Sequence, residues 1–240
     1  IEAKRVWPNF IVGHPDWLRS VQIPTIVDTD VALLLGICWA DGVLNLSYEH
    51  NYLQLIGSGR DMEFYKCIVA PLVQRVHHIA PEITDRFADV DFSGNPASYT
   101  KPVFVVGSVA ISTWLRDDLG LTENRTFLRS PKCDFDEQGK KYFMAGIIAA
   151  HASINKMNEM YISDTDLQFI KIIYYNLQNL GLNPRVNERK DSYQLAISPR
   201  DVYLLAEIGV PLLNPAHEII KPKQHSLKIN ARANQVMQTI

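Results

Sequence analysis

Two stretches of the chain are rich in apolar residues, and each predicts a buried helix. The first covers residues 31–41 and the second covers residues 138–150. Apolar residues surround the first helix instead of following one stripe, which is typical of a helix packed on most sides, and the second repeats the apolar run. Both carry small residues four positions apart, which allow another backbone to approach closely: Ala32, Gly36 and Ala40 in the first, Gly146 and Ala150 in the second.

Polar residues mark the ends of these two helices. The first can be capped by Asp28, Thr29 or Asp30, and the second by Asp134 or Asp136. Gly42 is expected to take the left-handed conformation that closes a helix. The first helix ends at Asp41, whose carboxylate faces the negative end of the helix dipole, an unfavourable position unless a cation lies there. When Gly36 is aligned with Gly146, the residue that matches Asp41 is His151.

The segments that follow each apolar helix have the same predicted order of strand, strand, helix, strand, strand, helix. After the first helix these segments are residues 44–48, 52–56, 61–76, 81–90, 101–106 and 108–120. After the second they are residues 153–158, 160–163, 166–180, 185–188, 193–198 and 199–208. An αββαββα unit is therefore predicted twice, near residues 28–121 and 134–213.

The apolar helices also resemble a known motif. Residues 35–42, Leu-Gly-Ile-Cys-Trp-Ala-Asp-Gly, resemble the first motif of the LAGLIDADG homing endonucleases in their single-chain, two-motif form. Residues 144–153 match the second motif only in their pattern of apolar positions. The acidic positions of the motif are occupied by Ala149 and His151, and its glycine position by Ala152. The resemblance implies an α+β fold with a pseudo-twofold axis, in which two antiparallel sheets form a saddle over double-stranded DNA.

The repeat and the resemblance together predict a domain organisation. An N-terminal arm covers residues 1–29 and the first repeat covers 30–121. A linker at 122–133 leads to the second repeat at 134–213. The tail, residues 214–240, is basic and is either a phosphate-contacting arm or a helix packed on the back of the protein.

The resemblance also implies a metal site. In the family the paired motif carboxylates bind divalent metals, which activate water and stabilise the leaving oxygen of a phosphodiester. Asp41 is thus expected to be a catalytic residue and a Mg²⁺ ligand. His151 occupies the second catalytic position, but imidazole is a poor ligand for Mg²⁺. Magnesium-dependent DNA cleavage is therefore expected to be weakened or lost. The helix interface is expected at Gly36, Ala40, Gly146 and Ala150.

Three functions remain open on this basis. The first is a double-stranded DNA-binding protein of the homing-endonuclease type. The second is a non-cleaving nucleic-acid binder, an intron maturase or a regulator, for which RNA is an alternative to DNA. The third is a scaffold protein that has kept only the fold. Nucleic-acid contacts are expected from basic residues on strands and hairpins: Lys101, Lys156, Arg185, Arg189 and Lys190.

The distribution of charge along the chain indicates which half is expected to contact phosphates. The net charge of −2 is unlike the basic excess of most nucleic-acid-binding domains. Residues 1–121 carry 9 Lys and Arg against 14 Asp and Glu, and residues 122–240 carry 15 against 12. Phosphate contacts should therefore lie mainly in the second half, and the acidic first half could contact a protein partner.

The sequence also bears on compartment and assembly. No apolar run has membrane-spanning length and no signal-peptide pattern opens the chain, so an intracellular location is expected, in cytoplasm or an organelle matrix. The resemblance to the single-chain form of the family implies a monomer. Cys38 and Cys67 are expected to be buried thiols, which suits a reducing compartment. The chain begins at Ile1 without a methionine, so a leader or flanking domain can precede it.

Overall fold

A computed structural model describes residues 20–46, 51–56, 61–87, 100–121 and 131–214 of the 240-residue chain. At residues 56, 85–87, 100 and 101 it describes the backbone alone. The predicted N-terminal arm up to residue 19, most of the linker and the basic tail beyond Asn214 lie outside the described residues. No helix in the described ranges is long and apolar enough to cross a membrane.

The first half has the predicted element order. Asp28 caps helix α3 (Thr29–Asp41) by accepting a hydrogen bond from Val31 N at 2.9 Å. The elements that follow are β1 (Gly42–Leu46), β2 (Asn51–Ile56), a second helix in three pieces, α4 (Met62–Phe64), η1 (Tyr65–Val69) and α5 (Ala70–His77), then β3 (Glu82–Phe87), β4 (Thr100–Gly107), α6 (Val109–Thr113) and η2 (Trp114–Asp118).

The second half repeats this order with more regular helices. Asp136 caps helix α7 (Glu137–His151) through Gly139 N, as Asp28 caps α3. The elements that follow are β5 (Ala152–Ile154), β6 (Met160–Asp164), α8 (Leu167–Asn179), β7 (Arg185–Glu188), β8 (Tyr193–Ile197) and α9 (Pro199–Glu207). The prediction of a duplicated αββαββα fold is confirmed.

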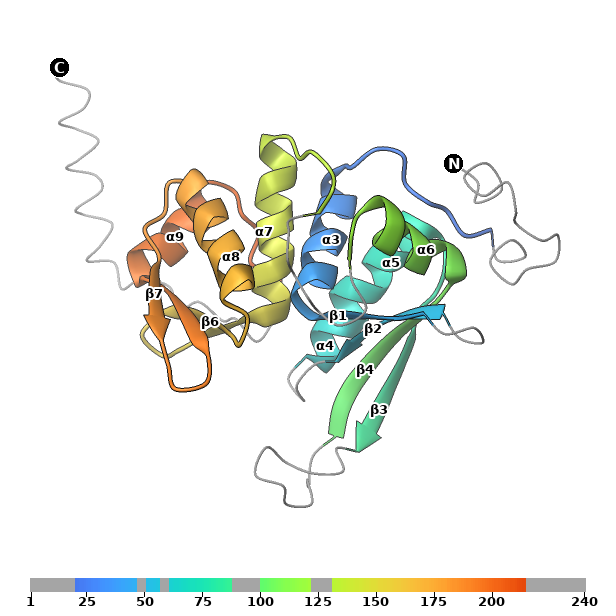
Figure 1. Cartoon of the computed structure of the whole chain (residues 1–240), viewed down its shortest axis with the longest axis horizontal. Coiled ribbons are helices and arrows are strands. Elements are labelled where there is room, and N and C mark those ends of the chain that lie inside the picture. Colours follow the sequence, from blue (N-terminus) through green and yellow to red (C-terminus); the bar gives the residue numbers. More distant parts are fainter. Residues whose placement is uncertain (1–19, 47–50, 57–60, 88–99, 122–130, 215–240) are drawn as a thin grey trace.

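Each half contributes one antiparallel sheet of four strands. The strand orders, β1-β2-β4-β3 and β5-β6-β8-β7, are equivalent. Alternate residues face the helices, so that Leu55 pairs with Phe104 in the first sheet and Ile162 with Leu195 in the second, all four fully buried. Figure 1 shows one sheet on either side of the central helices, with the β3–β4 and β7–β8 pairs extending in the same direction.

Helices α3 and α7 lie side by side at the centre of the molecule (Figure 1). Their backbones meet at two glycines, because a Cβ atom added to Gly36 would overlap the carbonyl oxygen of Phe143, and one added to Gly146 would overlap that of Leu33. Ala40 is also buried, and Ala150 is partly buried against the core. Any side chain at either glycine would therefore force the two helices apart.

Three details of the sequence prediction were wrong. Gly42 has extended backbone (φ −73°, ψ 134°), and its role is steric, since a Cβ there would overlap the carbonyl oxygen of Cys38. The strand predicted at residues 153–158 ends at Ile154, because the chain turns at Asn158, where φ is 61°. Cys67, expected to be buried, is exposed.

Cys67 lies in the π-helical turn η1, on the side away from the core. Ala70 N donates to Tyr65 O, five residues back, so the turn holds one residue more than an α-helical turn. Pro71, one residue further, has no N–H with which to continue an α-helical ladder. Tyr65 and Val69 of this turn face the core, and Cys67 faces solvent.

Candidate functional site

The C-terminal ends of α3 and α7 converge and bring two predicted site residues together. Nδ1 of His151 lies 2.8 Å from Oδ1 of Asp41. These are the last residues of the two helices, and they come from different halves of the chain. Both are largely buried, with side-chain exposures of 18% for His151 and 14% for Asp41.

The other ring nitrogen of His151 contacts strand β6. Nε2 lies 3.0 Å from the carbonyl oxygen of Ser163 and 3.4 Å from Oδ2 of Asp164. The ring also packs edge-to-face with Phe169 of α8, with ring centroids 5.7 Å apart. The imidazole is therefore held on three sides, between two carboxylates and an aromatic ring.

The partners of His151 determine its protonation. A carbonyl oxygen only accepts hydrogen bonds, so Nε2 must carry a proton to bond Ser163 O, and an ionised Asp41 likewise needs a proton on Nδ1. Burial lowers the pKa of His151, but hydrogen bonds to Asp164 and Asp41, with the charges of both carboxylates, raise it from 6.5 to about 10. The side chain is an imidazolium at neutral pH.

This arrangement does not fit a magnesium ion shared between the helix ends. Mg²⁺ needs oxygen ligands in octahedral geometry. Here the position opposite Asp41 holds a cationic nitrogen donor that already bonds the carboxylate. Within the described residues, no group of three or more His, Cys, Asp or Glu side chains is arranged to hold a metal. The other acidic motif position is Ala149, which has no ligand atom in its side chain.

A second link between the halves lies near the same end of α7. Asn214 is 5% exposed, and its Nδ2 donates to Ala149 O at 2.8 Å and to Oδ1 of Asp61 at 3.3 Å. Neither Asn214 nor Asp164 is among the site residues predicted from the sequence. The Asn-Pro pair at 214–215 was assigned to the start of the tail, and nothing in the sequence placed Asp164 next to His151, since only the β6 pairing and the helix ends bring them together.

The open face of the second sheet is polar and carries two of the predicted basic residues. Arg185 pairs in register with Ala196, on the face opposite the buried Leu195. Arg189, in the β7–β8 turn, donates from Nη2 to Oε1 of Gln194 at 2.7 Å. The face is completed by further polar side chains of the second sheet: Ser153, Tyr161, Ser163 and Asn187.

The remaining basic candidates are distributed over both halves. Lys156 and Lys190 are exposed in the turns that join β5 to β6 and β7 to β8. Lys101 lies on β4, where its backbone pairs with Arg86. In the first sheet a shallow hollow of about 380 Å³ is lined by uncharged side chains and one carboxylate: Tyr52, Gln54, Thr84, Val105 and Glu82. The described cationic candidates thus concentrate on the second half.

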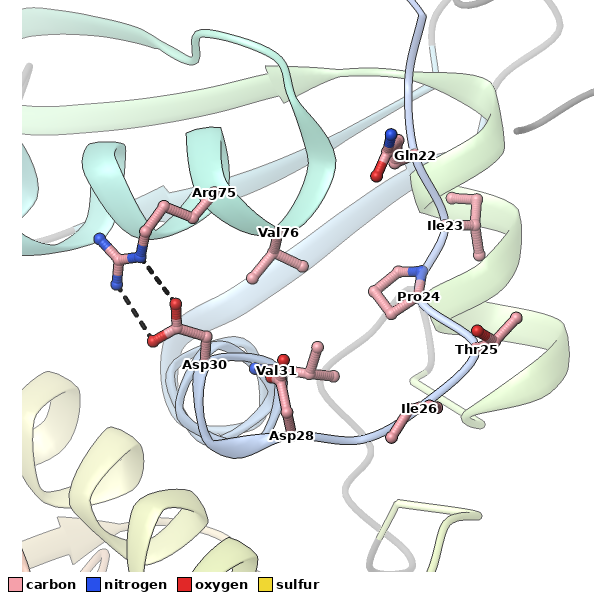
Figure 2. A pocket seen from close by; sticks show the side chains of 10 residues that line it. All are labelled: Gln22, Ile23, Pro24, Thr25, Ile26, Asp28, Asp30, Val31, Arg75 and Val76. Carbon is pink, nitrogen blue, oxygen red and sulfur yellow. Dashed lines mark hydrogen bonds and ion pairs between the residues drawn. The ribbon is translucent and has the colours of Figure 1, made fainter. Parts of the chain in front are cut away.

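Another hollow, of about 270 Å³, lies at the opposite end of α3 (Figure 2). Arg75 and Asp30 lie together on one side of it, joined in a two-bonded ion pair with N–O distances of 2.7 and 3.1 Å. Residues 22–26 form its other wall. Its charged pair is already neutralised, and the hollow lies at the opposite end of α3 from Asp41.

The comparisons with known proteins agree on the fold. No protein-family model and no curated protein matches the chain. Among solved structures, the homing endonuclease I-DmoI in complex with DNA and Ca is 20% identical, with a TM-score of 0.53, 85% of this chain and 98% of that chain covered. The complex of I-DmoI with DNA and Mn is 18% identical with a TM-score of 0.52, and the match covers 81% of this chain and 100% of that chain.

A second kind of protein shares the fold. Full-length DUF199/WhiA from Thermotoga maritima is 14% identical, with a TM-score of 0.52, covering 93% of this chain and 72% of that chain. Identities this low show a common fold and not a common activity. The protein has the duplicated α+β fold of the LAGLIDADG homing endonuclease I-DmoI.

Proposed function

We propose that this protein binds double-stranded DNA across its two sheets and cleaves it weakly or not at all. The observation that carries the proposal is the pair of equivalent antiparallel sheets on either side of one helix pair. Antiparallel strands can enter the major groove, where polar side chains read base edges. I-DmoI, which has this fold, was crystallised with DNA.

Loss of efficient cleavage is proposed from the paired helix ends. Hydrolysis through divalent metals needs oxygen ligands around the scissile phosphate, and His151 occupies a ligand position as a cation bonded to Asp41. The wild-type chain should leave a bound duplex intact or nick it slowly in Mg²⁺. His151→Asp should increase metal-dependent nicking, and Asp41→Asn should abolish any that remains. Efficient double-strand cleavage by the unaltered chain would refute this part of the proposal.

Binding is tested by the salt dependence of affinity for a duplex. A complete saddle that neutralises about six to ten phosphates loses roughly three to five decades of affinity between 50 and 200 mM salt. We expect a shallower slope here, because the first half is net acidic. Replacing Arg185 or Arg189 with alanine should weaken binding, and Lys171→Ala is a matched control, since Lys171 is exposed on α8.

The alternatives give different outcomes in the same assay. A preference for structured RNA over duplex DNA would favour an intron maturase. Absence of binding to both at 50 mM salt would favour the scaffold function, in which the acidic first half contacts a protein.

A further inference from the structure

We propose that His151 is a resident cation that takes the electrostatic place of a metal ion between the two halves, so that DNA binding requires no divalent ion. The inference rests on the proposed function for its DNA-binding part. Its structural part concerns the Asp41–His151–Asp164 cluster alone.

The geometry carries the structural part. The ring of His151 reaches a carboxylate of the first half through Nδ1 and strand β6 of the second half through Nε2. All three side chains are no more than 20% exposed, so water competes weakly for these bonds. Both ring nitrogens are used within the protein. His151 is therefore placed to hold its neighbours, and it has no free nitrogen with which to contact a phosphate.

The charges explain why a cation is needed here. Asp41 ends α3, and the C-terminal ends of both α3 and α7 carry partial negative charge. Asp164 adds a second carboxylate to the same small region. Without the imidazolium, this concentration of negative charge would lie between the sheets, where the proposed duplex brings its phosphates. One imidazolium removes half of the formal charge of the two carboxylates and binds the halves together.

The structural part is tested without DNA, by nitrogen-15 NMR of the histidine rings at pH 7.5. His151 should show two protonated ring nitrogens, with slowly exchanging protons on both. His78→Gln is the control for assignment and stability, because His78 is an exposed histidine just beyond α5. A neutral His151 ring at this pH would overturn the proposal.

The functional part is tested by duplex affinity in EDTA and in Mg²⁺. Wild-type affinity should agree within about twofold in the two buffers, beyond the effect of ionic strength. His151→Gln should bind on the order of tenfold more weakly in EDTA and recover in Mg²⁺, since the positive charge that the imidazolium places between the two carboxylates is then lost. His151→Lys keeps a positive charge and should restore binding in EDTA. It also provides a second variant if the glutamine variant is unstable.

The outcomes separate the two proposals. The proposal that His151 is a resident cation would be overturned if the wild-type protein needs Mg²⁺ to bind the duplex. It would also be overturned if His151→Gln binds the duplex as tightly as wild type in EDTA. A wild-type protein that binds no duplex in either buffer would overturn the proposed function. The NMR result would then decide by itself whether His151 is positively charged.

Discussion

The two halves of the protein have the same topology but differ in their outer helices. In the first half, both outer helices contain a π-helical turn, η1 and η2, whereas α8 and α9 of the second half are α-helical throughout. The starts of the matching helices differ as well. Asp166 caps α8 through Gln168 N at 2.7 Å, but Asp61 makes no cap bond and accepts a hydrogen bond from Asn214.

This difference between the outer helices shows how one fold accommodates two ways of packing a helix against the core. A π turn widens a helix by one residue and rotates everything after it. In the first half this rotation directs large side chains into the core, where Tyr65 packs against Phe104 and His77 against Trp114. In the second half, α8 needs no such rotation, because its apolar stripe of Phe169, Ile170, Ile173 and Leu177 already has α-helical spacing.

The largest expected effect tests where the halves are most alike, at the central helix pair. Gly36→Ala and Gly146→Ala should each destabilise the protein by about 3 kcal/mol or more, and leucine at either site should prevent folding. Gly107→Ala is the control, because a Cβ there meets nothing within 4 Å. Urea denaturation measures the unfolding free energy of the three alanine variants. Costs that differ strongly between the two glycines would show that the helix contact is not equivalent on its two sides.

The contrast between the halves also explains which parts of the fold the sequence could predict. Element order and the central helices followed from hydrophobic periodicity, capping residues and the repeat. The β7–β8 hairpin followed in the same way, with predicted strands at 185–188 and 193–198 and observed bounds Arg185–Glu188 and Tyr193–Ile197. Local patterns suffice there because neighbouring residues determine those elements.

The π turns and the full site could not be predicted, for two physical reasons. A π turn depends on how a helix packs, and the α-helical template assigned Cys67 to the buried stripe by its spacing alone. The pairing of Asp41 with His151 followed from the predicted helix pair, but the contacts of His151 with Ser163 and Asp164 depend on how strand β6 packs against the helix ends. The sequence did indicate that a cation should lie near Asp41, but not that His151 would supply it.

The second prediction concerns the charged histidine of the second half. The pKa of His151 rises from 6.5 unfolded to about 10 folded, so its stabilisation is complete below pH 6.5 and is lost as pH rises through 10. The loss should be roughly 3–5 kcal/mol, as for a broken buried ion pair. The free energies of unfolding of wild type and His151→Gln, determined by denaturation between pH 6 and 11, measure this loss. The difference in unfolding free energy between the two should shrink toward pH 11, and a constant difference would contradict the assignment.

The third prediction concerns the buried histidine of the first half, which should behave in the opposite way. His77 is 1% exposed, and its Nδ1 donates to Gln22 O at 2.8 Å. Burial lowers its pKa to about 4, so its contribution is present above pH 6.5 and is lost as pH falls toward 4. The loss should be about 2–3 kcal/mol. His77→Asn can keep the donor without titrating and should therefore lose less stability than wild type over that range.

The smallest expected effect tests which side of the first half's outer helix, residues 62–77, faces solvent. Cys67 is exposed, Cys38 is fully buried with its pKa raised to about 12, and burial and Asp134 raise the pKa of the half-buried Cys133 to about 11. Only a thiolate reacts readily with a disulfide reagent, so Cys67 should react at least about a hundredfold faster than Cys38 in the native protein. Mass spectrometry of the labelled peptides measures both rates, and Cys67→Ser should remove the fast phase. Slow labelling at Cys67 would show that its side chain is shielded in the native protein and that this helix is rotated from the orientation in which Tyr65 and Val69 face the core.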